Sequence, residues 1–262
     1  MKLSKNEKGL EKPKVFQKKI SKSKKIFFGL VIVLAILSAI NVFLPQGEFV
    51  GQFELPASKP VLAVVNFFIM LILYGGLGFL GLILTRKLGF AKIWDEKISN
   101  KQRFWNPLLI GVILGILFII VDLILSRFSG IKMLHPPFPT SLVASAIAGI
   151  GDEVIFRLFF ISFWVWLISH VIFRKKYQNR IFWIVAVISA IAFSFVHLPA
   201  TMMIFGFNSI SEIPVAFHVE VLLLNGSLSL IAAYYFRKYG LLAIVGIHFW
   251  LDVIWHVVYG VL

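Results

Sequence analysis

Apolar residues gather in seven runs that fill most of the chain. The runs cover about residues 26–44, 61–84, 107–125, 141–173, 181–197, 214–235 and 241–261. Most have about 20 residues, enough for a helix to cross the ~30 Å hydrocarbon core of a bilayer. Only helices and closed barrels satisfy their backbone groups in lipid, and runs this long are helices. The pattern therefore predicts an all-α, polytopic membrane helix bundle with about seven transmembrane helices.

The basic residues between the runs predict how the bundle is oriented. With the N-terminus inside, the inner side holds most of the 26 Lys and Arg residues: ten in 1–25, six in 86–103, four in 174–180 and two in 237–238. The outer side then holds only Lys59, Arg127 and Lys132. Because cytoplasmic segments carry the excess of basic residues, we expect a multi-pass protein of the cell membrane, with the N-terminus inside and Leu262 outside.

The composition excludes several classes of protein. With 59% hydrophobic residues, the chain of 262 residues is too apolar for an ordinary soluble domain. It has no cysteine, which excludes disulfides, thiolate catalysis and cysteine-ligated zinc. The net charge of +14 does not indicate a nucleic-acid partner, because the Lys-rich segment 1–25 suits orientation or contact with anionic membrane lipid. We expect residues 1–25 to be a disordered cytoplasmic tail and residues 26–262 to be the membrane domain.

Ten acidic and histidine side chains fall within the apolar runs. They are Asp122, Asp152, Glu153, Glu220, Asp252, His170, His197, His218, His248 and His256. Ionisable groups at membrane depth are costly, and they mark reactive sites or ion pathways. Spacing alone assigns no role to Asp122, His218, Glu220 or His256.

The stretch GDEVIFR, residues 151–157, places two adjacent carboxyl groups in different environments. Glu153 and Arg157 are four residues apart, so they share a helix face and can form an ion pair. Asp152 is rotated by about 100° and has Phe156 at i+4, so it has no local partner. We expect Arg157 to hold Glu153 ionised and desolvation to tune Asp152 as an acid or base. The alternative is a structural ion pair, with Asp152 paired across helices.

Two more polar stretches follow in the later runs. FSFVHLPA places His197 at the end of the fifth run, directly before a Leu-Pro pair. GIHFWLDVIWH places His248, Asp252 and His256 at i, i+4 and i+8, which forms a stripe on one helix. The spacing suits metal ligation or a His–Asp orienting pair. It also suits a polar seam that joins helices.

Together these stretches resemble the CAAX-processing and bacteriocin-processing intramembrane proteases, the Abi or CPBP family, which includes the type II CAAX prenyl endopeptidase. The family has a Glu-Glu-x-x-x-Arg motif, then Phe-x-x-x-His, then His-x-x-x-Asn or a variant. The matching residues are Asp152, Glu153, Arg157, Phe193, His197, His248 and Asp252. The resemblance covers about residues 138–262, which we expect to be the protease-like core.

The resemblance implies an endopeptidase that hydrolyses a membrane-associated peptide or protein with an activated water. Asp152 and His197 would hold and deprotonate the water, and His248 with Asp252 would steady the oxyanion or share a metal. Asp152, His197 and His248 are candidate ligands for one divalent metal such as zinc, although the family chemistry has also been argued to need no metal.

Three departures from the family pattern keep other functions open. The first acid is Asp152 instead of Glu, Leu158 stands where a small residue often follows the Arg, and Asp252 replaces Asn. One alternative is a weak or inactive protease-like protein that serves in immunity or as a scaffold. Another is a transporter in which the acids and histidines relay protons or cations. The sequence does not identify the substrate, its prenylation or the oligomeric state.

Overall fold

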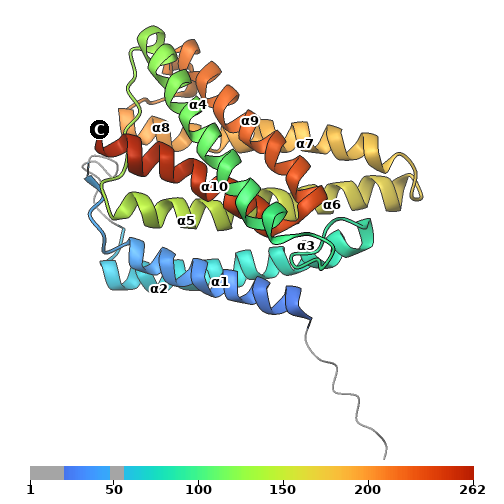
Figure 1. The fold of residues 1–262 in the computed structure, drawn as a ribbon. Helices are drawn as coiled ribbons and strands as arrows, with labels where there is room; N and C mark the ends of the chain where they lie inside the picture. Colours follow the sequence, from blue (N-terminus) through green and yellow to red (C-terminus); the bar gives the residue numbers. More distant parts are fainter. Residues whose placement is uncertain (1–20, 48–55) are drawn as a thin grey trace, which may run out of the picture.

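The computed structural model describes residues 21–47 and 56–262, and over these residues the protein is helical without any strand (Figure 1). Seven helices are long and apolar enough to cross a membrane. They are Lys22–Asn41, Lys59–Leu88, Lys101–Ser129, Thr140–Ile172, Gln178–Phe205, Val215–Tyr239 and Leu241–Val261. The predicted all-α membrane bundle with seven spans is confirmed. Its orientation, with the N-terminus inside, stays a prediction.

Several spans consist of more than one element. The first is α1 (Lys22–Asn41), and the second joins α2 (Lys59–Ile69), η2 (Met70–Tyr74) and α3 (Gly75–Leu88). The third joins η3 (Lys101–Trp105) and α4 (Asn106–Ser129). The fourth joins α5 (Thr140–Asp152), η4 (Glu153–Ile161), α6 (Ser162–Val165) and η5 (Trp166–Ile172). Because α1 begins at Lys22, the last residues of the segment expected to be a tail are helical, and residues 1–20 lie outside the described part.

The last three spans follow the same pattern. The fifth joins α7 (Gln178–Phe195) and α8 (Leu198–Phe205), and a short turn of helix, η6 (Ile210–Glu212), leads to the sixth, α9 (Val215–Tyr239). The seventh joins α10 (Leu241–Asp252), η7 (Val253–Val258) and η8 (Tyr259–Val261). Helix α10 lies between α4, α5 and α9, and α1 to α3 cover one side of the bundle (Figure 1).

Polarity is distributed as expected for a protein that lies in lipid. Large apolar side chains point outward from the spans, as at Ile72, Ile113 and Leu223, which are each more than half exposed. The charged side chains Glu153, Arg157 and Glu220, which lie away from the span ends, are fully buried. The exposed apolar surface faces lipid, because no water-soluble protein leaves so much of it uncovered.

Glycines bring α4 close to α10. A Cβ atom added at Gly111 would lie 2.6 Å from the carbonyl oxygen of Ile247, and one at Gly115 would lie 2.6 Å from Cβ of Ile254. No other residue fits at so small a separation, so this pair of small residues four apart sets the distance between the helices. The contact fixes the position of the helix that carries His248 and Asp252.

Three irregular points in the spans coincide with polar residues. The fourth span changes from α-helix to π-helix immediately after Asp152, and the seventh does so immediately after Asp252. The fifth span breaks between α7 and α8 at Val196 and His197, just before Pro199. Segments of π-helix are often found at functional sites. Each irregular point delivers a side chain to the same cavity.

Candidate active site

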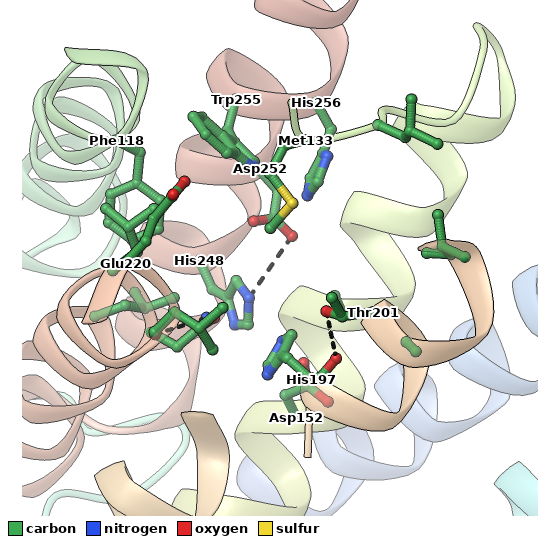
Figure 2. A pocket seen from close by; sticks show the side chains of 18 of the residues that line it. Phe118, Met133, Asp152, His197, Thr201, Glu220, His248, Asp252, Trp255 and His256 are labelled. Atoms are coloured by element: carbon green, nitrogen blue, oxygen red, sulfur yellow. Dashed lines mark hydrogen bonds and ion pairs between the residues drawn. The ribbon is translucent and has the colours of Figure 1, made fainter. Parts of the chain in front are cut away.

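A cavity of about 190 Å³ opens between α5, α8, α9 and α10 (Figure 2). Its polar lining residues come from three of the spans that carry the predicted motifs, and from α9. They are Asp152, His197, Thr201, Glu220, Asn225, His248, Asp252 and His256. Side chains separated by up to 104 positions in the sequence thus face one small space. Asp152 and His197 lie together on one side of it, next to His248 (Figure 2).

Asp152 is the acid of the GDEVIFR stretch that reaches the cavity. Its neighbour Glu153 does not line it, since successive residues of a helix point in directions about 100° apart. Asp152 also lines a second cavity of about 230 Å³, whose other walls include Asn41, Tyr74 and Gly151. The first two spans therefore help to enclose this carboxyl group from behind.

Glu153 is fully buried between two nitrogen-bearing side chains. Its Oε1 lies 2.9 Å from Nδ1 of His248, and its Oε2 lies 3.2 Å from Nε of Arg157. The second contact has the distance of an ion pair, but its angle does not make a hydrogen bond. The expected Glu153–Arg157 pair is present. The contact with His248 joins the fourth span to the seventh, which sequence spacing could not predict.

Arg157 is the largest fully buried side chain of the described residues. Its guanidinium carbon lies 4.6 Å from the centre of the Phe193 ring, and its nitrogens have no hydrogen-bond partner among these residues. A cation over an aromatic face is stabilised by the ring quadrupole. Phe193, the first residue of the Phe-x-x-x-His pattern, therefore supports the arginine of the first motif.

His197 has one ring nitrogen engaged and one available. Its Nδ1 lies 2.7 Å from the carbonyl oxygen of Phe193, one helical turn earlier. A carbonyl oxygen only accepts hydrogen bonds, so Nδ1 carries the proton and a neutral ring keeps Nε2 as an acceptor. The ring also packs edge-on against Phe193, at 4.9 Å between centroids. His197 thus presents a basic nitrogen from a fixed position at the break of the fifth span.

His248 lies between two carboxyl groups. Glu153 faces its Nδ1, and Oδ2 of Asp252 lies 3.6 Å from its Nε2, which is too long for a hydrogen bond. Asp252 therefore faces the imidazole, as one of the predicted alternatives requires. With acceptors on both sides the ring can carry two protons, and Nε2–H is free of a close partner.

The comparison with protein families agrees with these features. Residues 134–254 match the family model described as type II CAAX prenyl endopeptidase Rce1-like. This stretch is an Rce1-like domain. The predicted kinship with the CPBP/Abi proteases is confirmed, and so is the placement of the protein in a membrane. The spans that precede Ser129 lie outside the matched residues, and no curated protein and no solved structure matches the chain.

The candidate metal ligands Asp152, His197 and His248 line one cavity, and metal binding there stays a prediction. Among the described residues no group of three or more His, Cys, Asp or Glu side chains is arranged to hold a metal ion. Nδ1 of His197 and Nδ1 of His248 are engaged by a carbonyl and a carboxylate, and Asp252 faces Nε2 of His248. These contacts engage Nδ1 of each ring and leave Nε2 as the candidate ligand atom, and the mechanism proposed below uses no metal.

Several polar residues that spacing left without a role have partners or lie on the cavity. His256 lines it and lies 3.0 Å, Nδ1 to Nδ1, from His135 in the loop before α5. Asp122 on α4 accepts a hydrogen bond from Tyr259, at 3.3 Å. Glu220 lines the cavity, whereas His170 and His218 lie away from it. Only the unusual depth of these groups in apolar runs could have marked them in advance.

Proposed function

We propose that the protein is an intramembrane endopeptidase that hydrolyses a peptide bond with a water held by Asp152 and His197. The observation that carries the proposal is that these two side chains, His248 and Asp252 line a single cavity inside the bundle. Peptide hydrolysis in a membrane needs such an enclosed polar space, a water, a base and a group that stabilises the oxyanion. The membership of residues 134–254 in the Rce1-like family supports the same reaction.

Asp152 and His197 have complementary tasks in the proposed reaction. Nε2 of His197 accepts one hydrogen of the water and orients it, because its Nδ1 proton is held by the Phe193 carbonyl. The Asp152 carboxylate removes the other proton as the water oxygen attacks the carbonyl carbon of the peptide. The tetrahedral intermediate then collapses, the C–N bond breaks, and the proton on Asp152 moves to the leaving amine nitrogen.

His248 stabilises the negative charge that forms on the carbonyl oxygen. Glu153 favours the protonated ring through Nδ1, and Nε2–H lacks a close acceptor in the resting protein. The developing oxyanion is a stronger acceptor than a peptide carbonyl, so this N–H binds the transition state more tightly than the substrate. Glu153 and Arg157 are positioning residues here, since both are fully buried and neither lines the cavity.

Cleavage of a labelled membrane peptide by the full chain in lipid nanodiscs tests the proposal. We expect product with the unaltered protein and none with Asp152→Asn or His197→Gln. Asp95→Asn, which alters an acid in the loop before η3, is the matched control and should cleave normally. Parallel peptides with and without a prenyl group would identify the substrate class.

Two further arms separate the alternatives. Treatment with a strong chelator should leave the rate unchanged, and a loss that added zinc restores would contradict the metal-free mechanism. Ion flux in liposomes without any cleavage would favour a transporter. A folded protein that neither cleaves peptides nor conducts ions would be a protease-like scaffold or immunity protein.

A further inference from the structure

Glu220 is a buried acid on the cavity that the proposed hydrolysis does not use. Its side chain is fully buried within α9, yet it lines the cavity that also contains Asp152 (Figure 2). Neither of its oxygens has a hydrogen-bond partner among the residues described. A buried carboxyl without a donor is costly, so the site needs a partner that the chain does not supply.

Asp122 is a second buried acid next to Glu220, on the side away from the cavity. This neighbour of Glu220 accepts a hydrogen bond from the Tyr259 hydroxyl, at 3.3 Å. Asp122 is itself buried and does not line the cavity. Two neighbouring carboxylates attract a cation more strongly than one does, so Asp122 reinforces the attraction of Glu220 for a positive group.

The wall beside Glu220 is aromatic. Phe118 and Trp255 both line the cavity, and their rings pack edge to face with centroids 5.9 Å apart. Glu220 and Phe118 lie together on one side of the cavity, across from Asp152 and His197 (Figure 2). Carboxylates beside aromatic rings are the surroundings that recognise an ammonium or guanidinium group. No Lys or Arg residue lines the cavity to satisfy the acids from within.

We propose that Glu220, reinforced by the neighbouring Asp122, binds a basic side chain of the peptide substrate, a Lys ammonium or an Arg guanidinium, near the bond to be cut. This specificity rests on the proposed function, because the same cavity contains Asp152 and His197. When the cation enters, the Glu220 carboxylate accepts its hydrogen bonds, and the two opposite charges compensate each other. A neutral side chain at the same position leaves Glu220 without a partner and binds less well.

A pair of small probes tests the binding separately from the cleavage. N-octanoyl-lysinamide and N-octanoyl-norleucinamide carry the same chain length and differ in the terminal charge. Their binding to the full chain in nanodiscs is measured by calorimetry, with the variant Glu220→Gln and the exposed-loop control Glu212→Gln. We expect the lysinamide to bind on the order of 10- to 100-fold more tightly, which is the range for a hydrogen bond to a charged group. Glu220→Gln should abolish this preference, and Glu212→Gln should keep it.

Glu220→Asp provides a second variant in case the amide does not fold, since it keeps the charge and shortens the reach. It should retain part of the preference. Equal binding of the two probes to the unaltered protein, or an undiminished preference in Glu220→Gln, would overturn the proposal.

Cleavage of matched peptides completes the test. Peptides with Lys or Arg next to the cut bond should have a higher kcat/KM than the norleucine peptide, and Glu220→Gln should bring the ratio of these values close to one. If peptides are cut without preference, the specificity fails and the protease stands. If no peptide is cut but the lysinamide binds through Glu220, the basic site stands and the protease fails.

Discussion

Two pairs of acids lie inside the same bundle, and they differ in what surrounds them. In the first pair, Glu153 contacts Arg157 and His248, while Asp152 faces the cavity. In the second pair, Asp122 accepts a hydrogen bond from Tyr259, and neither oxygen of Glu220 has a hydrogen-bond partner among the described residues. Glu153 and Glu220 are equally buried, so burial alone does not distinguish them. Their partners distinguish them. The charge of Glu153 is compensated by Arg157 and His248, so it stabilises the fold, whereas Glu220 has no such partner and is proposed to bind a ligand.

The strongest test of this comparison concerns the reactive acid of the first pair. Asp152→Asn keeps the shape of the side chain and removes the base, so the cleavage rate should fall by at least about 10²- to 10⁴-fold. The fold should be unchanged, as judged by the melting temperature in detergent.

Asp152→Glu sharpens the same test, because it restores the family residue and lengthens the side chain by one methylene. If the cavity fits Asp, the rate should fall about a hundredfold, since a misplacement of about 1 Å has that effect. A rise would indicate that the chain is a weakened copy of the family enzyme. Full activity of Asp152→Asn together with an inactive but folded Glu153→Gln would reverse the assigned roles.

The next largest effect is expected at Arg157. Arg157→Ala leaves Glu153 ionised and buried with His248 as its one remaining cationic partner, so the free energy of unfolding should fall by about 3–5 kcal/mol. Equilibrium unfolding in mixed micelles measures it. Arg157→Lys keeps the charge but loses the planar contact with Phe193. Its free energy of unfolding should lie between those of the unaltered protein and Arg157→Ala. A protein as stable as the original after the alanine change would show that the pair is not structural.

The two glutamates can be compared directly by the same measurement. Glu153→Gln should lower the free energy of unfolding by about 3–5 kcal/mol, because it leaves the buried Arg157 without its carboxylate partner and weakens the contact with His248. Glu220→Gln should be neutral or stabilising, because it removes a carboxyl group that lacks a donor. Equal losses in the two variants would break the distinction between them.

The close approach of α4 to α10 fixes the position of α4, which carries Asp122 of the second acid pair, relative to the cavity. Gly111→Ala would place a methyl group 2.6 Å from the Ile247 carbonyl oxygen, so α4, which carries Asp122, must shift. Overpacking of this kind destabilises by about 1–3 kcal/mol. Gly29→Ala is the matched control, since a Cβ there has open space, and a helical alanine is favoured over glycine. Similar melting temperatures for the two variants would contradict the tight crossing.

The smallest effect is expected from His135, next to the second pair. Burial lowers the pKa of His135, the Asp122 carboxylate opposes this, and Lys132 lowers the pKa further. The unfolded chain therefore takes up the proton first, and stability conferred by neutral His135 should decline as the pH falls below about 6.5. The groups that face it are Asp122, Trp255, His256 and Tyr259. His135→Gln should have a melting temperature that depends less on pH between 7.5 and 5.5, and an unchanged slope would argue against this origin.

The sequence predicts much of this molecule because its strongest signals are local. A run of about 20 apolar residues is a membrane helix wherever its neighbours lie, so all seven spans could be located without a structure. The Glu153–Arg157 pair depends on the spacing of one helical turn. The direction of Asp152 toward the cavity depends on the rotation of about 100° between successive helix residues. The sequence placed His197 at the end of the fifth apolar run, and in the structure α7 ends at Phe195 and α8 continues the span to Phe205.

The features that only the tertiary structure determined are contacts between residues on different spans. The bond between Glu153 and His248 joins residues 95 positions apart, and that between Tyr259 and Asp122 joins residues 137 apart. Helix periodicity states which way a side chain points from its own axis, but it cannot state which helix stands opposite. Glycines such as Gly111 set these distances through shape, which leaves no periodic trace in the sequence. For that reason the positions of Glu220 and His256 on the cavity are visible only in the tertiary structure, in which four spans surround the cavity.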